Sequence, residues 1–196
     1  HWDKEYGKMR LLIVLVISLM TNQMSNALTL GDDGLYKPEW LQITFKDLHE
    51  DLGDANNLKK RFFIIFEQRG CIYCKEMHKT VFSDPDVYNL LEEHFFAVQM
   101  NLFGDEEVTD FDGEVLTEKE MAKKWGVVFT PTILFFPESN EKNHSANKSA
   151  VLTMPGAFTK FTTLSLLNFV VEKGYEGEEH FQKYHARKLA EKRTNN

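Results

Sequence analysis

The sequence predicts one α/β domain with a central mixed β-sheet and helices on both faces. Short apolar runs rich in aromatic and β-branched residues alternate along the chain with segments whose apolar residues recur at helical spacing. The chain has 196 residues, a length that suits one ordinary domain. Hydrophobic residues make up 42% of it and charged residues 27%, so a packed core is expected. A helical N-terminal extension and a charged helical tail flank the domain.

The first expected elements lead up to the two cysteines. Apolar residues at helical spacing predict an amphipathic helix over about 43–58, which Gly53 weakens. These apolar residues are Phe45, Leu48, Leu52 and Ala55. Residues 61–67 are apolar on both faces, which is typical of a strand in the interior of a covered sheet. Gly70 ends this strand, and a helix is expected from Cys71 to about Val81.

Capping signals and apolar periodicity predict the remaining elements. Asp84-Pro85 is typical of a helix start, and Thr117-Glu-Lys-Glu120 has the spacing of a capping box. The next expected elements are, in chain order, a helix from Asp84 to His94, a strand over 95–102, an acidic loop over 104–115 and a helix from Thr117 that Gly126 ends. A strand over 132–136, a polar hairpin loop over 139–149 and a strand over 151–154 follow. The last are a core helix that carries Leu164, Leu167, Val170 and Val171 and closes at Gly174, and a peripheral helix after Glu176.

Residues 1–27 have the pattern of an export signal. Three basic residues precede the apolar run 11–20, whose ten residues are too few for a membrane span of about 20. Ser25 and Ala27 would occupy the −3 and −1 positions of a cleavage site. An N-terminal anchor helix is the alternative. With cleavage, the chain divides into a signal peptide at 1–27, an N-terminal extension at 28–59, the main domain at 60–175 and a charged tail at 176–196, without a permanent membrane anchor.

Composition argues against several classes of function. Lys and Arg number 23 against 30 Asp and Glu, and this net charge of −7 disfavours a nucleic-acid binder. Two cysteines, Cys71 and Cys74, cannot build a four-thiolate zinc site, a cysteine-ligated iron–sulfur cluster or a scaffold of several disulfides. Lys75 follows the second cysteine directly, where covalent c-type haem attachment requires histidine.

The motif Cys71-Ile-Tyr-Cys74 lies at the expected junction of a buried strand and a helix. A cysteine at a helix N-terminus faces unpaired backbone N–H groups and the helix dipole, which favour its thiolate. The second cysteine is one turn away, close enough to form or resolve a disulfide with the first. The motif therefore predicts a redox-active pair. A structural disulfide is the weaker alternative, because closing so small a loop removes little chain entropy.

Metal binding is a further alternative for the same motif. Cys71, Cys74 and His78 share a helical face, and soft or borderline ligands of this kind hold zinc or copper. The interpretation that we favour instead makes His78 a surface residue of the same helix.

Thr130-Pro131-Thr132 precedes one of the expected strands. Proline often begins a strand, where the ladder needs no N–H group. In a redox domain, a cis proline beside the disulfide has a second use, because it presents the backbone of the preceding residue to an incoming peptide.

Two segments together resemble the thioredoxin superfamily, namely Phe66-Glu-Gln-Arg-Gly-Cys-Ile-Tyr-Cys-Lys-Glu-Met-His78 and Phe129-Thr-Pro-Thr-Ile-Leu-Phe-Phe136. More narrowly, the chain resembles the exported SoxW-type thioredoxins associated with bacterial sulfur oxidation, with further matching stretches at 98–105, 108–113 and 154–156. The resemblance covers residues 38–185 and implies a thioredoxin fold.

The resemblance also implies a role for each matched residue. Cys71 would be the exposed nucleophile that attacks a substrate disulfide. Cys74 would be the resolving thiol, which releases reduced product and leaves a Cys71–Cys74 disulfide. Pro131 would be the cis proline that faces this pair. Thr130 would offer backbone hydrogen bonds to the substrate, and Gly156 would line the substrate groove.

The chain departs from ordinary thioredoxins in two respects. Ile72 and Tyr73 replace the usual Gly-Pro between the cysteines, where they would tune the redox poise and meet the substrate. Ile65 replaces the buried aspartate that stands six positions before the first cysteine and serves as proton acceptor for the resolving thiol. Glu67, on the same face of the strand, is the candidate substitute. Alternatively, Glu67 is a surface carboxylate at the strand end.

The motifs and the resemblance predict a periplasmic thiol:disulfide oxidoreductase linked to sulfur oxidation. It would reduce disulfides or mixed thiol adducts on disulfide-containing periplasmic client proteins and would bind no nucleic acid. Electrons would come from a membrane dithiol donor, because the sequence holds no nicotinamide or flavin motif, and the Cys71–Cys74 disulfide would be the redox group. The enzyme alternatives are a disulfide isomerase, which normally needs a dimer, or an oxidase. The binding-protein alternative is a periplasmic zinc or copper carrier that uses Cys71, Cys74 and His78.

Overall fold

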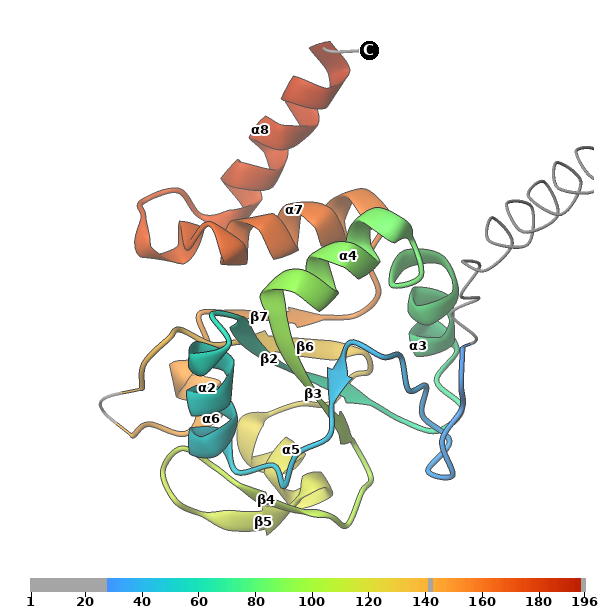
Figure 1. The fold of residues 1–196 in the computed structure, drawn as a ribbon, viewed down its shortest axis with the longest axis vertical. Coiled ribbons are helices and arrows are strands. Elements are labelled where there is room, and N and C mark those ends of the chain that lie inside the picture. Colours follow the sequence, from blue (N-terminus) through green and yellow to red (C-terminus); the bar gives the residue numbers. More distant parts are fainter. Residues whose placement is uncertain (1–27, 141–142, 195–196) are drawn as a thin grey trace, which may run out of the picture.

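The computed structural model describes residues 28–140 and 143–194, and Figure 1 shows how they fold. The expected export signal and the alternative anchor helix, both at 1–27, lie outside the described residues. Within the described ranges, no helix is long and apolar enough to cross a membrane.

A five-stranded mixed sheet forms the centre of the fold, with its strands in the order β1-β3-β2-β6-β7. These strands are β1 (Leu41–Gln42), β2 (Arg61–Glu67), β3 (Phe95–Asn101), β6 (Thr132–Phe135) and β7 (Leu152–Pro155). β3 runs parallel to β1 and β2, whereas β6 is antiparallel to both β2 and β7. β4 (Glu107–Thr109) and β5 (Val115–Thr117) form a separate antiparallel pair.

Helices cover both faces of the sheet (Figure 1). One face carries α3 (Ile72–Glu76), the π-helical turn η1 (Met77–Val81), α4 (Pro85–His94) and α7 (Lys160–Val171), with α8 (Phe181–Thr194) packed outside α7 after the short 3-10 helix η2 (Gly174–Glu176). The other face carries α2 (Leu48–Asn57), α5 (Glu118–Trp125) and α6 (Ala146–Ser149).

β2 supplies both cores because its side chains alternate between the two faces. Phe63 and Ile65 belong to the cluster under α4 and α7, while Phe62, Ile64 and Phe66 belong to the cluster under α2 and α5. All five side chains are buried. The continuous apolar run thus reflects a central strand that is covered on both sides, as the sequence predicts.

The capping signals predicted two helix boundaries correctly. The Asp84 side chain caps α4, with Pro85 in its first turn. Thr117 and Glu120 form the capping box of α5, and Gly126 ends that helix in the left-handed conformation with φ 71°.

The helix predicted over 43–58 begins later than expected. Asp47 is its N-cap, and the Asp47 side chain accepts hydrogen bonds from two backbone N–H groups of the first turn. Phe45, assigned to the apolar face, lies before the helix and is 95% exposed. The spacing of Phe45 was misleading because a local side-chain cap fixes where the helix starts.

Two segments expected as loops contain regular structure. The acidic segment 104–115 includes β4 and the start of β5, and the polar connection between β6 and β7 includes the single turn α6. The charged tail forms α8, whose Phe181 and Tyr184 are buried against Phe169 of α7.

Candidate active site

The two cysteines lie where β2 passes into a helix. β2 ends at Glu67, and Gly70 turns the chain with φ 75°. Cys71 then takes the N-cap position of α3, where its Sγ accepts a hydrogen bond from the Cys74 backbone N–H at 3.0 Å. The first turn of the helix therefore directs a backbone donor at this sulfur, which favours a thiolate once the disulfide is reduced.

Cys71 and Cys74 form a disulfide and differ in exposure. Cys74 is 3% exposed, whereas Cys71 is half-buried at the surface. A sulfur that attacks another protein must be reachable from outside, and a sulfur that resolves the adduct need not be. The arrangement suits Cys71 to attack and Cys74 to resolution.

The cis peptide bond between Thr130 and Pro131 faces this pair. Thr130 Oγ1 donates a hydrogen bond to Cys71 Sγ at 3.3 Å, and the Thr130 carbonyl oxygen lies 3.5 Å from the same sulfur. The Pro131 carbonyl accepts a hydrogen bond from the Gly156 N–H at 2.7 Å, which ties the end of β7 to this loop. Gly156 has φ 99°, which side-chain-bearing residues disfavour. The structure thus brings together all four of these predicted site residues.

Exposed apolar side chains surround the disulfide. Ile72 and Tyr73 are 70% and 62% exposed, and Val128 and Phe129 of the loop before the cis proline are 70% and 66% exposed. The sequence assigned roles to the first two but not to Val128 or Phe129. Their position in the sequence was the signal that could have identified them. Val128 and Phe129 are apolar but lie before the strand expected from residue 132, so that strand does not bury them.

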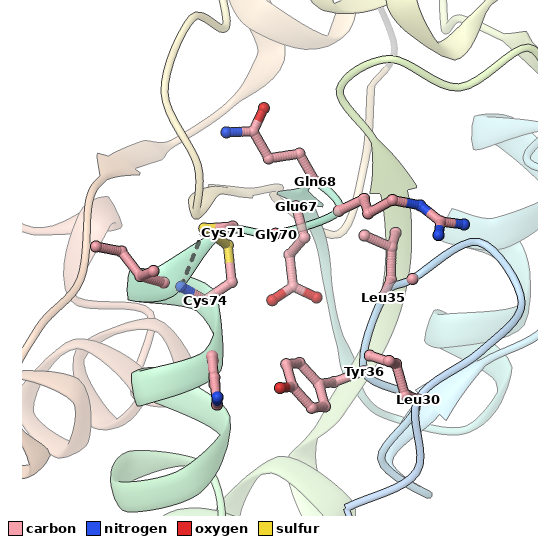
Figure 2. Close-up of a pocket in the computed structure, with 12 residues that line it drawn as sticks. Leu30, Leu35, Tyr36, Glu67, Gln68, Gly70, Cys71 and Cys74 are labelled. Atoms are coloured by element: carbon pink, nitrogen blue, oxygen red, sulfur yellow. Dashed lines mark hydrogen bonds between the residues drawn. A yellow bond between two sulfur atoms is a disulfide. The ribbon is translucent and has the colours of Figure 1, made fainter.

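A pocket of about 310 Å³ opens beside the disulfide, between the β2–α3 turn and the N-terminal segment (Figure 2). Leu30, Leu35 and Tyr36 form one wall of this pocket, opposite Cys71 and Cys74. Figure 2 shows the N-terminal segment running past the disulfide in a turn. An isolated bridge between Leu30 and Tyr36 closes this turn.

Arg69 fastens the N-terminal segment to the β2–α3 turn. Its Nη2 donates a hydrogen bond to the Asp32 carbonyl at 2.6 Å, and its side chain lies against Gly34. The sequence did not predict that this segment takes part in the site, because no motif marks a contact between residues so distant in the chain.

Glu67 is buried at the base of the pocket, with 1% of its surface exposed. Figure 2 shows its carboxylate between Cys74 and Tyr36. Oε1 lies 2.7 Å from His78 Nε2, and Oε2 accepts a hydrogen bond from Gln99 Nε2. The alternative that Glu67 is a surface carboxylate is therefore wrong, since β2 continues beneath the helix and carries Glu67 with it.

Gln99 of β3 links Glu67 to the N-terminal segment. Its Nε2 also donates to the Tyr36 carbonyl at 2.9 Å, and its Oε1 accepts a hydrogen bond from Lys37 Nζ at 2.6 Å. In the β2–β3 register, Gln99 pairs with Ile65, two residues before Glu67. A glutamine within an otherwise apolar central strand was the sequence signal that could have identified this residue.

His78 is also buried, with 1% exposed, so its interpretation as a surface residue is wrong. It belongs to the inward face of α3 and η1, together with Cys74, Met77 and Val81. This i, i+3, i+4, i+7 pattern was present in the sequence and could have indicated burial. The His78 ring lies beside Tyr36, Trp40 and Phe82.

The structure does not gather the proposed metal ligands. His78 Nε2 is engaged with Glu67 rather than directed at the cysteines. Among residues 28–140 and 143–194, no three His, Cys, Asp or Glu side chains are placed together as ligands for a metal ion.

Comparisons with known proteins agree with this architecture. The thioredoxin-like domain family matches residues 48–145. No curated protein matches the chain. A thioredoxin-fold protein from Helicobacter pylori is 21% identical, with a TM-score of 0.50 over 70% of this chain and 86% of that one, and this likeness shows the fold. A thioredoxin from Thermus thermophilus is 26% identical, with a TM-score of 0.49 over 64% and 85% of the two chains. The C-terminal domain of DsbD from Neisseria meningitidis is 14% identical, with a TM-score of 0.41 over 64% and 90%.

Proposed function

The chain belongs to the thioredoxin-like domain family, and on this basis we propose that it is a thiol:disulfide oxidoreductase that reduces disulfides or mixed thiol adducts on client proteins. One observation carries the proposal. An accessible sulfur, Cys71, sits at a helix N-terminus beside a cis proline and is paired with a sheltered sulfur, Cys74. A disulfide that only braced the fold would gain little from closing so short a loop.

The reaction has two exchange steps. The Cys71 thiolate attacks a client disulfide, forms a mixed disulfide and displaces the other client sulfur as a thiolate. Cys74 then loses its proton and attacks Cys71 Sγ, so the Cys71–Cys74 bond forms while the bond from Cys71 to the client breaks. The client gains two electrons, and the protein becomes oxidised.

Glu67 is the proton acceptor that we assign to Cys74. Both residues line the same pocket, and Glu67 is the carboxylate at its base. A thiol as sheltered as Cys74 needs a nearby base to become a nucleophile.

Clients would dock on the surface around Cys71. The backbone of Thr130, next to the cis proline, would pair with an extended client segment beside its cysteine. Ile72, Tyr73, Val128 and Phe129 would pack against apolar client side chains that flank the bond, and Gly156 would line the groove where a side chain would crowd it.

The cellular setting is proposed from the sequence. An export signal and the resemblance to SoxW-type thioredoxins support a periplasmic protein linked to sulfur oxidation, recharged by a membrane dithiol donor. The Cys71–Cys74 pair would be the only redox group, with disulfide-bearing periplasmic proteins as clients.

The proposal is tested by the reduction potential of the pair and by trapping. A potential near the roughly −270 mV of thioredoxin identifies a reductant, and one near the roughly −120 mV of DsbA identifies an oxidase instead. We expect Cys74→Ser to accumulate mixed disulfides with clients, whereas Cys71→Ser, the matched control, accumulates none. Failure of the metal-free protein to form the disulfide would refute the redox function.

A further inference from the structure

The hydrogen-bonded pair Glu67 and His78 lies between two separate pockets. Glu67 lines the pocket of about 310 Å³ beside the disulfide. His78 lines a second pocket of about 270 Å³, which is formed by the N-terminal segment, η1 and the start of α4. Glu67 Oε1 and His78 Nε2, 2.7 Å apart, therefore join the two pockets.

Both side chains of the pair are buried. Each side chain is 1% exposed. Gln99 bonds Glu67 from the side of β3, and the rings of Tyr36 and Phe82 lie 5.2 Å from the His78 ring, centroid to centroid. Gln99 also links Glu67 to Lys37, but an amide does not take up and release a proton as an imidazole does. Among the described residues, His78 is therefore the partner of Glu67 that can carry a proton onward.

The second ring nitrogen of His78 is available on the far side of this contact. Among the described residues, His78 Nδ1 is buried and has no hydrogen-bond partner. A buried nitrogen without a hydrogen-bond partner lowers the stability of the fold, so its presence calls for an explanation such as a functional role. A ring with one nitrogen on a carboxylate and the other unpaired can accept a proton at one atom and release one at the other.

We propose that His78 carries the proton of the resolution step from Glu67 to the second pocket. This inference rests on the proposed function and extends it. The first pocket shares Cys71 and Ile72 with the surface where a client docks, so a bound client covers its mouth. The second pocket contains neither residue and stays open.

The proton balance of the step is complete. Cys74 Sγ gives its proton to Glu67 as it forms the bond to Cys71 Sγ, and the client leaves as a thiolate with the electron pair of the broken bond. The ring starts this step with its proton on Nδ1, so that Nε2 can accept one. Protonated Glu67 passes a proton to His78 Nε2 while Nδ1 releases its own proton into the second pocket, which leaves Glu67 as the carboxylate and the neutral ring protonated on Nε2. The transfers run in reverse when the pair is reduced again: Nδ1 takes up a proton from the second pocket, Nε2 gives one to Glu67, and Glu67 returns a proton to Cys74.

Other titratable or charged side chains border the route and are kept unchanged in the test. Those that line the two pockets are Tyr36, Lys37, Glu39, Arg69, Lys75, Lys79 and Tyr88.

The test measures the rate of resolution with two variants of His78. A mixed disulfide between Cys71 and a short cysteine peptide is formed in the full chain, and release of the peptide is followed by rapid mixing. His78→Gln keeps a hydrogen-bond donor for Glu67 but cannot relay a proton, and we expect resolution to slow by about 100-fold. His78→Gly opens a void next to the second pocket, and we expect added imidazole to restore its rate.

The controls separate this inference from the proposed function. His94→Gln, at an exposed histidine that ends α4, should resolve at the wild-type rate. Resolution at the wild-type rate in His78→Gln, or no response to imidazole in a His78→Gly protein with an intact circular dichroism spectrum, overturns the relay. If His78→Gly fails to fold, His78→Gln decides alone. A wild-type protein that never releases the peptide instead refutes the proposed function.

Discussion

Glu67 is a buried glutamate beside the disulfide, and each of its two carboxyl oxygens has a hydrogen-bond partner. His78 and Gln99 contact its two carboxyl oxygens, so neither oxygen is left without a partner in this buried site. The same contacts fix the carboxylate at the base of the pocket that Cys74 lines. The Glu67 carboxyl group is thus held in one position and is not a flexible surface side chain.

Replacing Glu67 tests its role directly. Glu67→Gln keeps the shape of the side chain but cannot accept a proton, so we expect resolution to slow by about 10²- to 10⁴-fold while the first attack by Cys71 is unchanged. The measurement is the amount of mixed disulfide that persists in a single turnover. Glu76→Gln, at an exposed position at the end of α3, is the control. Equal single-turnover rates in Glu67→Gln and wild type would rule out the role.

Asp51 is a second buried carboxylate and lies far from the disulfide in the sequence. Burial raises the pKa of Asp51 to about 7, a hydrogen bond from Thr44 opposes the rise, and the nearby charges of Asp47, Asp54 and Glu50 add to it. Its pKa in the folded protein is therefore above the unfolded value near 3.9. The stability that the protonated carboxyl contributes is full below about pH 4 and is lost as the pH rises through about 7.

Asp51→Asn should remove this pH dependence. The amide stays neutral and can still accept the hydrogen bond from Thr44, so we expect the variant to be more stable than wild type by about 2 kcal/mol at pH 8 and equal to it at pH 4. Urea unfolding at both pH values measures the difference. Asp32→Asn, at an exposed position of the N-terminal segment that does not contribute to the raised pKa of Asp51, should show no such trend. A constant difference between Asp51→Asn and wild type at both pH values would contradict the assignment.

At the scale of elements, two glycines in helices α2 and α5 should respond oppositely to the same substitution. Gly126 follows the last residue of α5 and has φ 71°, whereas Gly53 lies at an exposed position inside α2. A Cβ atom added at either glycine would meet no atom within 4 Å. Only backbone conformation therefore separates them. We expect Gly126→Ala to cost about 1 kcal/mol and Gly53→Ala to gain about 0.5 to 1 kcal/mol. Denaturant unfolding measures both, and effects of the same sign would refute this account.

The elements that could be predicted are those with local causes. β2, α4 and α5 have the expected boundaries. Each is determined by nearby residues in the sequence, namely the apolar run 61–67, the cap at Asp84 and the capping box at Thr117. The start of α2 was misplaced because Asp47 competes locally with the spacing of Phe45. β1 was not predicted, because its two residues form a strand only by pairing with β3, and no pattern in the nearby sequence indicates that pairing.

At the scale of the whole molecule, the site is assembled from segments far apart in the chain. The cysteines and the cis proline could be assigned from motifs because each motif is short and carries its own chemistry. Gln99 depends on the register of β3 against β2, and Tyr36 depends on the path of the N-terminal segment, so neither could be placed from sequence alone. The resemblance to ordinary thioredoxins does not place the buried carboxylate either, because the position that it gives for the proton acceptor is Ile65 in this chain and not Glu67.

The packing of α8 on α7 should support the stability of the molecule without setting its redox chemistry. Phe181 is 7% exposed and packs on Phe169, in the cluster that covers one face of the sheet, while the pocket beside the disulfide includes no residue of either helix. We expect Phe181→Ala to cost about 3 kcal/mol through the cavity it leaves, and to lower the Tm by about 6 to 12 °C. The reduction potential of the Cys71–Cys74 pair, measured on the same full-length protein, should stay at the wild-type value, because the substitution changes the oxidised and reduced states alike. Gln182→Ala, at the exposed neighbouring position, should leave both quantities unchanged. A potential that shifts with Phe181→Ala would instead mean that the helical layer transmits strain to the disulfide, and that stability and redox poise in this fold are coupled.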